Sequence, residues 1–553
     1  MMYKIKFLLF SIFLIQLVVG SEINQNPIVK TPCGDIRGSI IRTVLGRSIY
    51  SFRGIRYAKA PVGELRFEPP VPAGKWNGTY DATNDWPACP QPGDIPTSED
   101  CLILNVYTTK LPSARHNPKR AVMFYIHPGG FFSLSSVSRW VGPHYYLDQD
   151  IVLVTINYRL ASLGFISTGD KWAPGNNGFK DQIIALKWVK ENIASFGGDP
   201  NLVTIVGYSA GGVSVAGHLL SPMSIGLFHR AIGMSALVFG QTPIGNHQFN
   251  LAQIQARLVG CPDDTSENIM TCLRTKSAKE LGDSLGGFSE YGDLVQLWTP
   301  VIEPDFGQAR FLVEHPIVSA MNGNFQKVPI MAGLTEQEFS YLAIGVVNDP
   351  EMLRRMDEDF ETVAPIAFVY ERNTTKSRIV SERLREAFLG PGPLTQSSLQ
   401  GIGYLYADGI IGFGVNRGVK LFAAKNTENT YYYLLTFPGR YSYYTLPNTT
   451  TPYGVVHHDD LIYMFYSEIF PKLNTSDPEY VMVRKLTTLH TNFACTGNPT
   501  PSITKNLDNV FWTPFTSQNN AYMDMGKKLI MKKDLNKYRY SVWEDLFPLS
   551  DYQ

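Results

Sequence analysis

The sequence predicts an α/β protein in which a large, mostly parallel central sheet is flanked by helices. Three apolar runs, at residues 121–127, 151–157 and 202–206, are rich in β-branched and aromatic residues and are typical of strands buried on both faces. Apolar residues repeat at helical spacing between the second and third runs: Phe179, Ile183, Leu186, Val189 and Ile193. A strand, a crossover helix and a second strand in this order indicate a parallel sheet.

The rest of the chain extends this sheet. Further strands are predicted at residues 230–234, 328–332 and 430–436. No internal repeat or low-complexity linker divides the sequence. We therefore predict a single domain over residues 21–553, with helical insertions mainly at residues 240–320 and 340–425.

The composition is that of a globular protein and excludes one class of partner. Hydrophobic residues make up 44% of the 553 residues, which is sufficient for a sizeable core. Lys+Arg and Asp+Glu each number 49, so the formal net charge is zero. Because no basic block stands out, we expect no nucleic-acid partner.

The N-terminus predicts export. Lys4 and Lys6 precede an apolar run at residues 7–19, and Val18 and Gly20 are the small residues of a cleavage site. This pattern indicates a signal peptide over residues 1–20; a membrane anchor is the alternative, but the apolar run is short for spanning a bilayer. We expect a secreted, extracellular protein without a membrane anchor. Four glycosylation sequons agree with this route: Asn77, Asn373, Asn448 and Asn474.

Six cysteines in an exported chain suggest disulfides. Cys89 with Cys101, and Cys261 with Cys272, would each close a short loop rich in Pro, Asp or Ser. Local pairing is therefore plausible for these four residues. The partners of Cys33 and Cys495 stay open.

A nucleophile motif follows the strand predicted at residues 202–206. Gly207-Tyr208-Ser209-Ala210-Gly211 matches GxSxG and precedes an apolar helical stretch that runs to Leu220. The glycines permit a sharp strand-to-helix turn that raises the serine hydroxyl above a sheet. The alternative is a Gly-rich turn whose serine only caps the helix. The strand-turn-helix context favours Ser209 as a nucleophile.

A second glycine-rich loop, His127-Pro128-Gly129-Gly130-Phe131, follows the strand at residues 121–127. Its position is typical of the oxyanion loop of esterases, in which backbone N–H groups stabilise a developing negative charge. Gly129, Gly130 and Ala210 are the candidate donors. By itself the loop is also compatible with an ordinary strand-ending turn.

A serine nucleophile needs a base and an acid, in the chain order Ser, acid, His. His457 lies in a loop after the last predicted strand, and we expect its neighbour His458 to face solvent. Two carboxylates, Glu336 and Glu338, follow the strand at residues 328–332. Local sequence does not decide between them.

These motifs resemble the type-B carboxylesterase and cholinesterase family over nearly the whole mature chain. Residues 196–211, around Ser209, resemble the nucleophile signature of the family, and residues 99–106 resemble its second signature. The resemblance implies an α/β-hydrolase fold with helical insertions. It also implies Glu338 as the acid and His457 as the base. Its disulfides match the pairs Cys89–Cys101 and Cys261–Cys272.

Other positions follow or depart from the family pattern. Arg66 with Glu99, and Arg159 with Asp181, resemble its buried ion pairs. Cholinesterases carry Glu before the serine and a tryptophan in the first disulfide loop, whereas this chain has Tyr208 and no aromatic in that loop. Juvenile hormone esterases usually have Gln before the serine. The sequence is most similar to secreted insect carboxylesterases.

The resemblance implies a secreted serine carboxylesterase that forms an acyl-enzyme on Ser209 and needs no cofactor and no metal. We expect a small apolar ester as its substrate, in a pocket to which Phe131, Phe132 and Trp298 contribute; core packing is the alternative for each ring. Juvenile-hormone-esterase-like activity is a variant of this hypothesis. The rivals are a non-catalytic adhesion or binding protein, and an ester-sequestering protein. The sequence names neither the physiological ester nor the oligomeric state.

Overall fold

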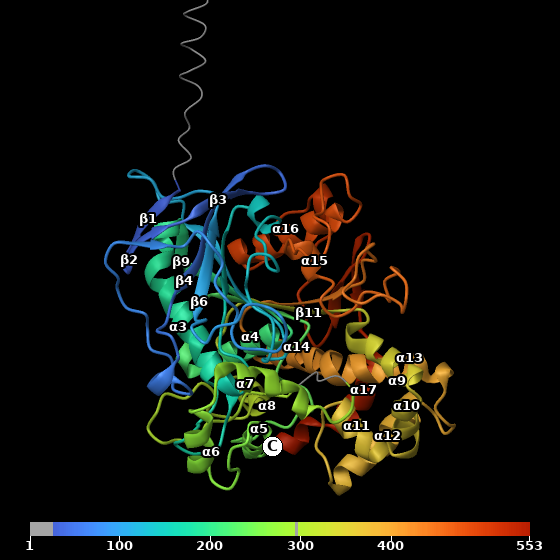
Figure 1. Cartoon of the computed structure of the whole chain (residues 1–553). Coiled ribbons are helices and arrows are strands. Elements are labelled where there is room, and N and C mark those ends of the chain that lie inside the picture. The colour runs from blue at the N-terminus through green and yellow to red at the C-terminus, as the bar shows by residue number, and fades with distance from the viewer. Residues whose placement is uncertain (1–25, 293–296) are drawn as a thin grey trace, which may run out of the picture.

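A twisted sheet of 11 strands forms the centre of the structure, a computed structural model that describes residues 26–292 and 297–553 (Figure 1). In spatial order its strands are β14 (Leu529–Lys533), β13 (Ala521–Met525), β12 (Thr430–Leu435), β11 (Ile330–Thr335), β10 (Arg230–Met234), β9 (Gly198–Tyr208), β7 (Arg120–Ile126), β8 (Val152–Ile156), β6 (Ile103–Thr108), β4 (Ser48–Arg56) and β3 (Ser39–Arg42). Neighbours from β13 through to β8 are parallel, and the outer pairs are antiparallel. The predicted mostly parallel sheet is therefore confirmed.

The six predicted strands are all present, and two of them differ from the predicted bounds by two or more residues. β9 begins at Gly198, four residues before the predicted start, because Gly198 pairs with Arg120 of β7. β11 begins at Ile330, two residues after the predicted start. Pro329 directly precedes β11, and a proline has no N–H to contribute to a central ladder.

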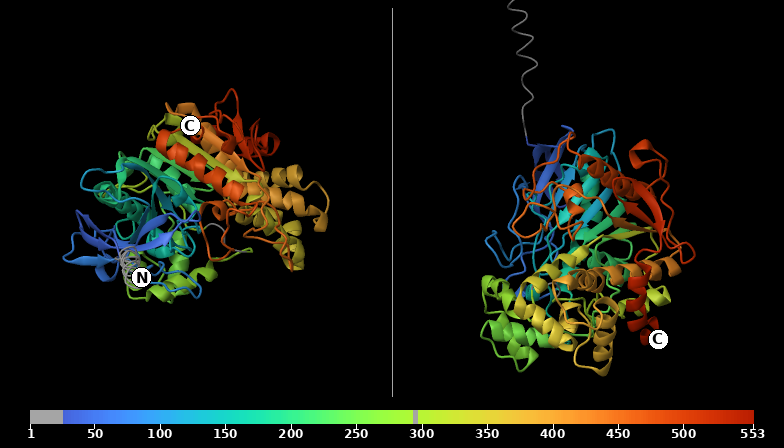
Figure 2. Two further views of the ribbon diagram at one scale, coloured as in Figure 1. Left: turned by 90° about the horizontal axis from the view of Figure 1, so that it is seen from above. Right: turned by 90° about the vertical axis from the view of Figure 1, so that its right-hand side faces the viewer.

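Helices cover both faces of the sheet (Figure 2). On one face α3 (Asn177–Asn192), α4 (Ala210–Leu220) and α14 (Phe413–Lys425) share a core with Val122, Phe124 and Ile126 of β7. On the other face α16 (Tyr480–Thr496) shares a core with the alternate residues Ala121, Met123 and Tyr125. The continuous apolar run in β7 is explained by burial on both sides.

Two groups of helices are inserted after β10 and β11, and both lie at the lower end of the molecule in Figure 1. The first contains α5 (Phe249–Leu258), α6 (Ser266–Leu273) and α7 (Ala278–Asp283). The second contains α9 (Leu342–Asn348), α10 (Pro350–Glu358), α11 (Phe360–Ala367), α12 (Thr375–Phe388) and α13 (Leu399–Ala407), which build their own core with α17 (Lys537–Leu546). α14 packs on β11 and β12, so the second insertion ends before α14 and not at residue 425.

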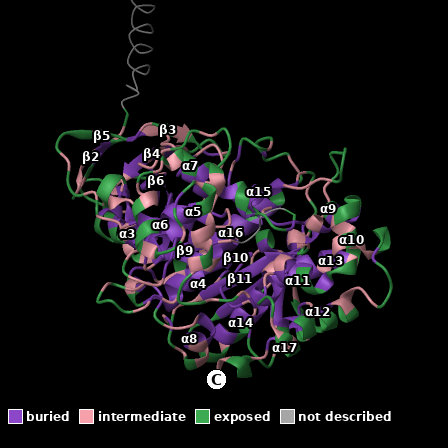
Figure 3. Cartoon of the chain, turned by 60° about the horizontal axis from the view of Figure 1, so that its bottom comes forward, coloured by how far each residue is buried: buried purple, intermediate pink, exposed green. Residues whose placement is uncertain are grey.

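Burial follows this layered plan. Figure 3 shows the strands buried and much of the outer surface of the peripheral helices exposed. A small separate sheet of β1 (Ile28–Thr31), β2 (Gly34–Arg37) and β5 (Thr79–Asp81) flanks the N-terminal side. The signal peptide predicted at residues 1–20 lies outside the described residues. Within the described ranges, every helix is too short or too polar to cross a membrane.

Both local disulfides are present, and the remaining cysteines are unpaired within the described residues. Cys89 bonds Cys101, and Cys261 bonds Cys272, with Cα–Cα distances of 5.1 and 5.7 Å. Cys33 is half-buried and Cys495 is exposed. The four sequon asparagines are all exposed: Asn77, Asn373, Asn448 and Asn474.

The two ion pairs that the resemblance implies differ in burial. Arg159 donates to Asp181 from Nε at 2.8 Å and from a terminal nitrogen at 2.6 Å, and the side chains are 3% and 0% exposed. The backbone N–H of Arg159 also donates to Asp181, at 3.0 Å. Arg66 and Glu99 form a similar bidentate pair but are only partly buried. The Arg159–Asp181 pair ties the loop after β8 to α3 in the core.

We expect Asp181→Asn to lower the free energy of unfolding by about 3–5 kcal/mol, because it leaves the buried Arg159 guanidinium without a counter-charge. Chemical denaturation measures this loss. Glu351→Gln is the matched control, since Glu351 pairs with Arg354 on the exposed surface at 2.8 Å. An exposed pair contributes about 0–1 kcal/mol. Equal losses in the two variants would show that the Arg159–Asp181 pair does not stabilise the core.

Candidate active site

Ser209 lies at a strained turn between β9 and α4. Its backbone angles are φ 54° and ψ −120°, a conformation that residues other than glycine rarely adopt. A Cβ at Gly207 would lie 2.0 Å from the carbonyl oxygen of Gly211, and one at Gly211 would lie 2.1 Å from that of Ile126. Only glycine therefore fits at these two positions of the motif. Among the described residues, the Ser209 side chain makes no capping hydrogen bond to α4, so it is not simply a helix cap.

The structure brings Ser209, His457 and Glu338 together from three distant segments. Nε2 of His457 lies 2.9 Å from Oγ of Ser209. Nδ1 of the same ring lies 2.5 Å from Oε2 of Glu338. The imidazole and the carboxylate thus lie in one line with the serine hydroxyl, within hydrogen-bond reach at both contacts.

The loops that carry the acid and the histidine are bonded to each other. The N–H of His457 donates to the carbonyl of Glu338 at 3.2 Å, and the N–H of Gln337 donates to the carbonyl of Val455 at 2.9 Å. A Cβ at Gly454 would overlap the Gln337 side chain, so Gly454 permits this close approach. Glu338 is also held by the N–H of Thr335, which donates to its Oε1 at 2.8 Å.

Burial shifts the pKa values of both His457 and Glu338. Because His457 is buried, the pKa of its imidazole is lowered, which favours the neutral form that accepts a proton. Burial also raises the pKa of Glu338, while the hydrogen bond from the Thr335 N–H lowers it. The Thr335 N–H is therefore one of the contacts that stabilise the carboxylate form of Glu338.

The two alternatives that local sequence left open occupy different environments. Glu336 is exposed on the surface, whereas Glu338 is buried beside His457. The expectation that His458 faces solvent is wrong: its Nε2 is buried, and its ring lies 5.2 Å from the ring of Tyr208. The N–H of His458 donates to the Tyr208 hydroxyl at 2.6 Å.

The glycine-rich loop after β7 makes a tight turn. Gly129 and Gly130 have φ of 109° and 59°, and a Cβ at Gly129 would lie 2.0 Å from the carbonyl oxygen of Ser133. The Gly129 carbonyl accepts hydrogen bonds from the N–H groups of Phe132 and Ser133, both at 2.9 Å, which closes a tight turn. Gly130 and Ala210 line the same cavity as Ser209.

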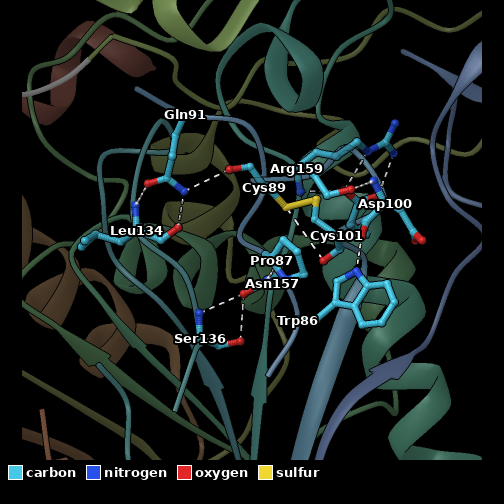
Figure 4. The surroundings of a disulfide bond; sticks show 12 residues. Trp86, Pro87, Cys89, Gln91, Asp100, Cys101, Leu134, Ser136, Asn157 and Arg159 are labelled. Atoms are coloured by element: carbon cyan, nitrogen blue, oxygen red, sulfur yellow. Dashed lines mark hydrogen bonds and ion pairs between the residues drawn. A yellow bond between two sulfur atoms is a disulfide. The ribbon is translucent and has the colours of Figure 1, made fainter. Parts of the chain in front are cut away.

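The first disulfide is connected to this loop through Gln91 (Figure 4). The Gln91 amide donates to the carbonyl of Leu134 at 2.9 Å and accepts from the N–H of Leu134 at 2.7 Å. It also donates to the carbonyl of Cys89 at 3.1 Å. Ser136 lies two residues after Leu134, and its N–H and hydroxyl both donate hydrogen bonds to the Asn157 side chain. The far end of the glycine-rich loop is thus fixed to a segment that the first disulfide cross-links.

An apolar cavity of about 70 Å³ begins at Ser209. Phe131 lines it, as expected. Trp298 is fully buried and packs on Phe288, with ring centroids 5.8 Å apart, so the alternative of core packing applies to Trp298. Phe339 also lines the cavity and lies over the His457 ring at 4.1 Å between centroids. Among the described residues, no group of three His, Cys, Asp or Glu side chains is arranged to hold a metal ion.

Comparison with known proteins shows the family to which the chain belongs. Residues 25–543 match the model of the Carboxylesterase family. The chain belongs to the carboxylesterase family. Relatives include a juvenile hormone esterase of Tribolium castaneum, 37% identical over 86% of this chain and 84% of the relative, and a carboxylic ester hydrolase of Bombus ignitus, 34% identical over 86% of each. A venom carboxylesterase-6 of Apis mellifera is 34% identical over 90% of each chain.

Family membership makes the chain a carboxylic ester hydrolase with the α/β-hydrolase fold and confirms the resemblance to insect carboxylesterases. Three contacts of the site were not predicted from the sequence. These are the Thr335 N–H on Glu338, the Phe339 ring on His457 and the Gln91 amide on Leu134. No local motif marks them, and the contacts of Phe339 and Gln91 depend on how separate loops meet in the folded carboxylesterase.

We expect Gln91→Ala to lower kcat for ester substrates, because it releases the oxyanion loop at Leu134. A displacement of about 1 Å costs up to about 100-fold in rate. Gln255→Ala is the matched control: Gln255 is also buried, donates to Ser284 at 2.9 Å, lies in α5 and does not line the cavity at Ser209. Steady-state kinetics and thermal unfolding of both variants separate the two effects. A similar fall in kcat in both would mean that general destabilisation, and not loop position, is the cause.

Proposed function

We propose that this chain is a secreted serine carboxylesterase that cleaves small apolar esters through an acyl-enzyme on Ser209. The observation that carries the proposal is the hydrogen-bonded line from Ser209 through His457 to Glu338, at 2.9 and 2.5 Å. A purely binding or sequestering protein has no need of a complete line of this kind. Its presence favours catalysis over both rival functions.

In the first half of the reaction, Ser209 Oγ forms a bond to the ester carbonyl carbon while His457 Nε2 takes the hydroxyl proton. The carbonyl oxygen becomes an oxyanion, for which the N–H groups of Gly129, Gly130 and Ala210 are the proposed donors. Glu338 stabilises the imidazolium. When the carbon–oxygen bond of the alcohol breaks, the proton on His457 passes to the leaving alcohol.

In the second half, water repeats the sequence on the acyl-enzyme. His457 takes a proton from water, the hydroxide oxygen bonds to the acyl carbon, and the oxyanion forms in the same place. The carbon–oxygen bond to Ser209 then breaks, and His457 returns its proton to the serine. The carboxylic acid is released, and no cofactor takes part in any step.

Several features support secretion and an apolar substrate. The signal-like segment, two disulfides and four exposed sequons agree with an exported protein. The apolar cavity at Ser209 suits an uncharged ester. Juvenile-hormone-esterase-like activity is the second candidate, which the 37% identity to the Tribolium castaneum enzyme favours.

We expect Ser209→Ala to lower the turnover of p-nitrophenyl esters by several orders of magnitude, because no nucleophile remains to form the acyl-enzyme. Absorbance of released p-nitrophenol measures it, and circular dichroism checks that the variant is folded. A folded variant that is as active as the wild type would place the chemistry elsewhere. Equal inactivity of both proteins on every ester would favour the binding function.

Glu338→Gln tests the acid, and Glu336→Gln is its matched control two residues away. Loss of the carboxylate beside His457 should lower kcat by about 10⁴-fold, because the imidazole then lacks both its orientation and its counter-charge. Glu336 is exposed, so its variant should stay within about twofold of the wild type, as surface changes usually do. If Glu336→Gln were the inactive variant, the proposed acid would be wrong.

A further inference from the structure

The backbone around Pro128 does not by itself fix the direction of the Gly129 N–H. The peptide bonds of the described residues are all trans, so the Pro128 carbonyl and the Gly129 N–H point in opposite directions from one peptide plane. A proline followed by a glycine fits both type I and type II turns, which differ by a half-turn of the peptide between the two residues. A contact that holds the Pro128 carbonyl therefore also orients the Gly129 N–H.

The His127 side chain makes such a contact. Its Nδ1 lies 2.7 Å from the carbonyl oxygen of Pro128. A carbonyl oxygen only accepts hydrogen bonds, so Nδ1 carries the proton and is the donor. Burial lowers the pKa of His127 to about 4, which keeps the ring neutral near pH 7 and leaves Nε2 unprotonated. Nε2 has no hydrogen-bond partner in the part of the chain that the structure describes.

Tyr158, in the loop after β8, holds the histidine in place. Its ring is stacked on the imidazole, with centroids 4.4 Å apart and an angle of 19° between the planes. Its hydroxyl donates to the carbonyl of His127 at 3.0 Å. Tyr158 is itself fully buried. One rigid residue thus fixes both the ring and the backbone of His127.

The Gly129 N–H is one of the donors proposed for the oxyanion. Among the described residues, neither Gly129 nor Gly130 donates to another backbone group, whereas the Gly129 carbonyl accepts two hydrogen bonds. An inverted peptide would turn the Gly129 N–H away and direct the Pro128 carbonyl oxygen toward the same place. The partial negative charge of that oxygen would repel an oxyanion.

We propose that His127 is a positioning residue of this esterase: its hydrogen bond to the Pro128 carbonyl holds the Gly129 N–H in the direction that stabilises the oxyanion. The proposal rests on the function proposed above. His127 does not line the cavity at Ser209, so it acts through the backbone and takes no proton from the substrate. A histidine that only filled space in the core could be replaced by any side chain of similar size.

The test compares variants that keep or remove the N–H donor at this position. In His127→Asn the amide nitrogen is one bond from Cγ, as Nδ1 is, so it can still donate to Pro128. The nitrogen of His127→Gln is one bond further away, and His127→Leu has none. With p-nitrophenyl butyrate we expect kcat to fall by about 100-fold to 1,000-fold in the Leu and Gln variants, as on removal of one oxyanion donor. KM should change by less than about twofold, and His127→Asn should recover most of kcat.

His490→Leu is the matched control. His490 is also fully buried, its Nδ1 lies 2.6 Å from the Tyr146 hydroxyl, and its ring is stacked on that tyrosine. It lies in α16 and does not line the cavity at Ser209. Thermal unfolding measures the stability of each variant, and His490→Leu should keep the kcat of the wild type. An equal fall in kcat in His490→Leu, or equal kcat in the Asn and Gln variants, would overturn the proposal. The Asn and Gln variants carry the test if His127→Leu does not fold.

Inhibition by a trifluoromethyl ketone reports on the oxyanion site more directly. Ser209 Oγ adds to the ketone carbon, the hydroxyl proton passes to His457, and the carbonyl oxygen becomes an oxyanion without loss of a leaving group. The inhibition constant should rise in His127→Leu and His127→Gln by about the factor by which kcat/KM falls. An unchanged inhibition constant would show that His127 does not act on the oxyanion donors.

Crystal structures of the variants separate this proposal from the proposed function, because they require no catalysis. We expect the peptide between Pro128 and Gly129 to be inverted in His127→Leu and to keep its direction in His127→Asn. If the wild type hydrolysed no ester, the proposed function would fail, and this pair of structures would still support the role of His127 in orienting the Gly129 N–H. The same peptide direction in both variants would contradict that role.

Discussion

The proposed site depends on one backbone contact, the close crossing of α4 over the carboxyl end of β7. Gly211 approaches the carbonyl of Ile126 so closely that no Cβ fits between them, and Gly207 approaches Gly211 in the same way. This crossing forces Ser209 into a left-handed backbone conformation at the start of α4. The strain is supported by strands on both sides, because β9 is buried between β7 and β10.

Parallel strands then bring the other partners to the same edge. β9, β11 and β12 run in one direction, so the loops that follow them meet at their carboxyl ends. Glu338 follows β11, and His457 follows β12 after a longer connection. Backbone hydrogen bonds between these two loops hold the imidazole at a fixed height above the sheet. The position of His457 is thus determined by the loops after both β11 and β12, and not by its own loop alone.

The strands and the serine turn could be predicted from the sequence because their signals are local. A buried parallel strand is a short continuous apolar run, and the GxSxG motif spans only five residues. Glu338 could not be separated from Glu336 by local sequence, because what distinguishes them is burial beside a residue more than 100 positions away. The hydrogen bonds of Gln91 to Leu134 could not be predicted either, because a glutamine in the sequence is expected at the surface, whereas Gln91 is buried.

This division also separates the proposed site from the inserted helices. The serine turn and the glycine-rich loop belong to the sheet, where backbone packing permits few alternatives. The inserted helices α9 to α13 have, with α17, a core of their own. The line from Ser209 through His457 to Glu338 therefore rests on the strands and on the loops that follow them.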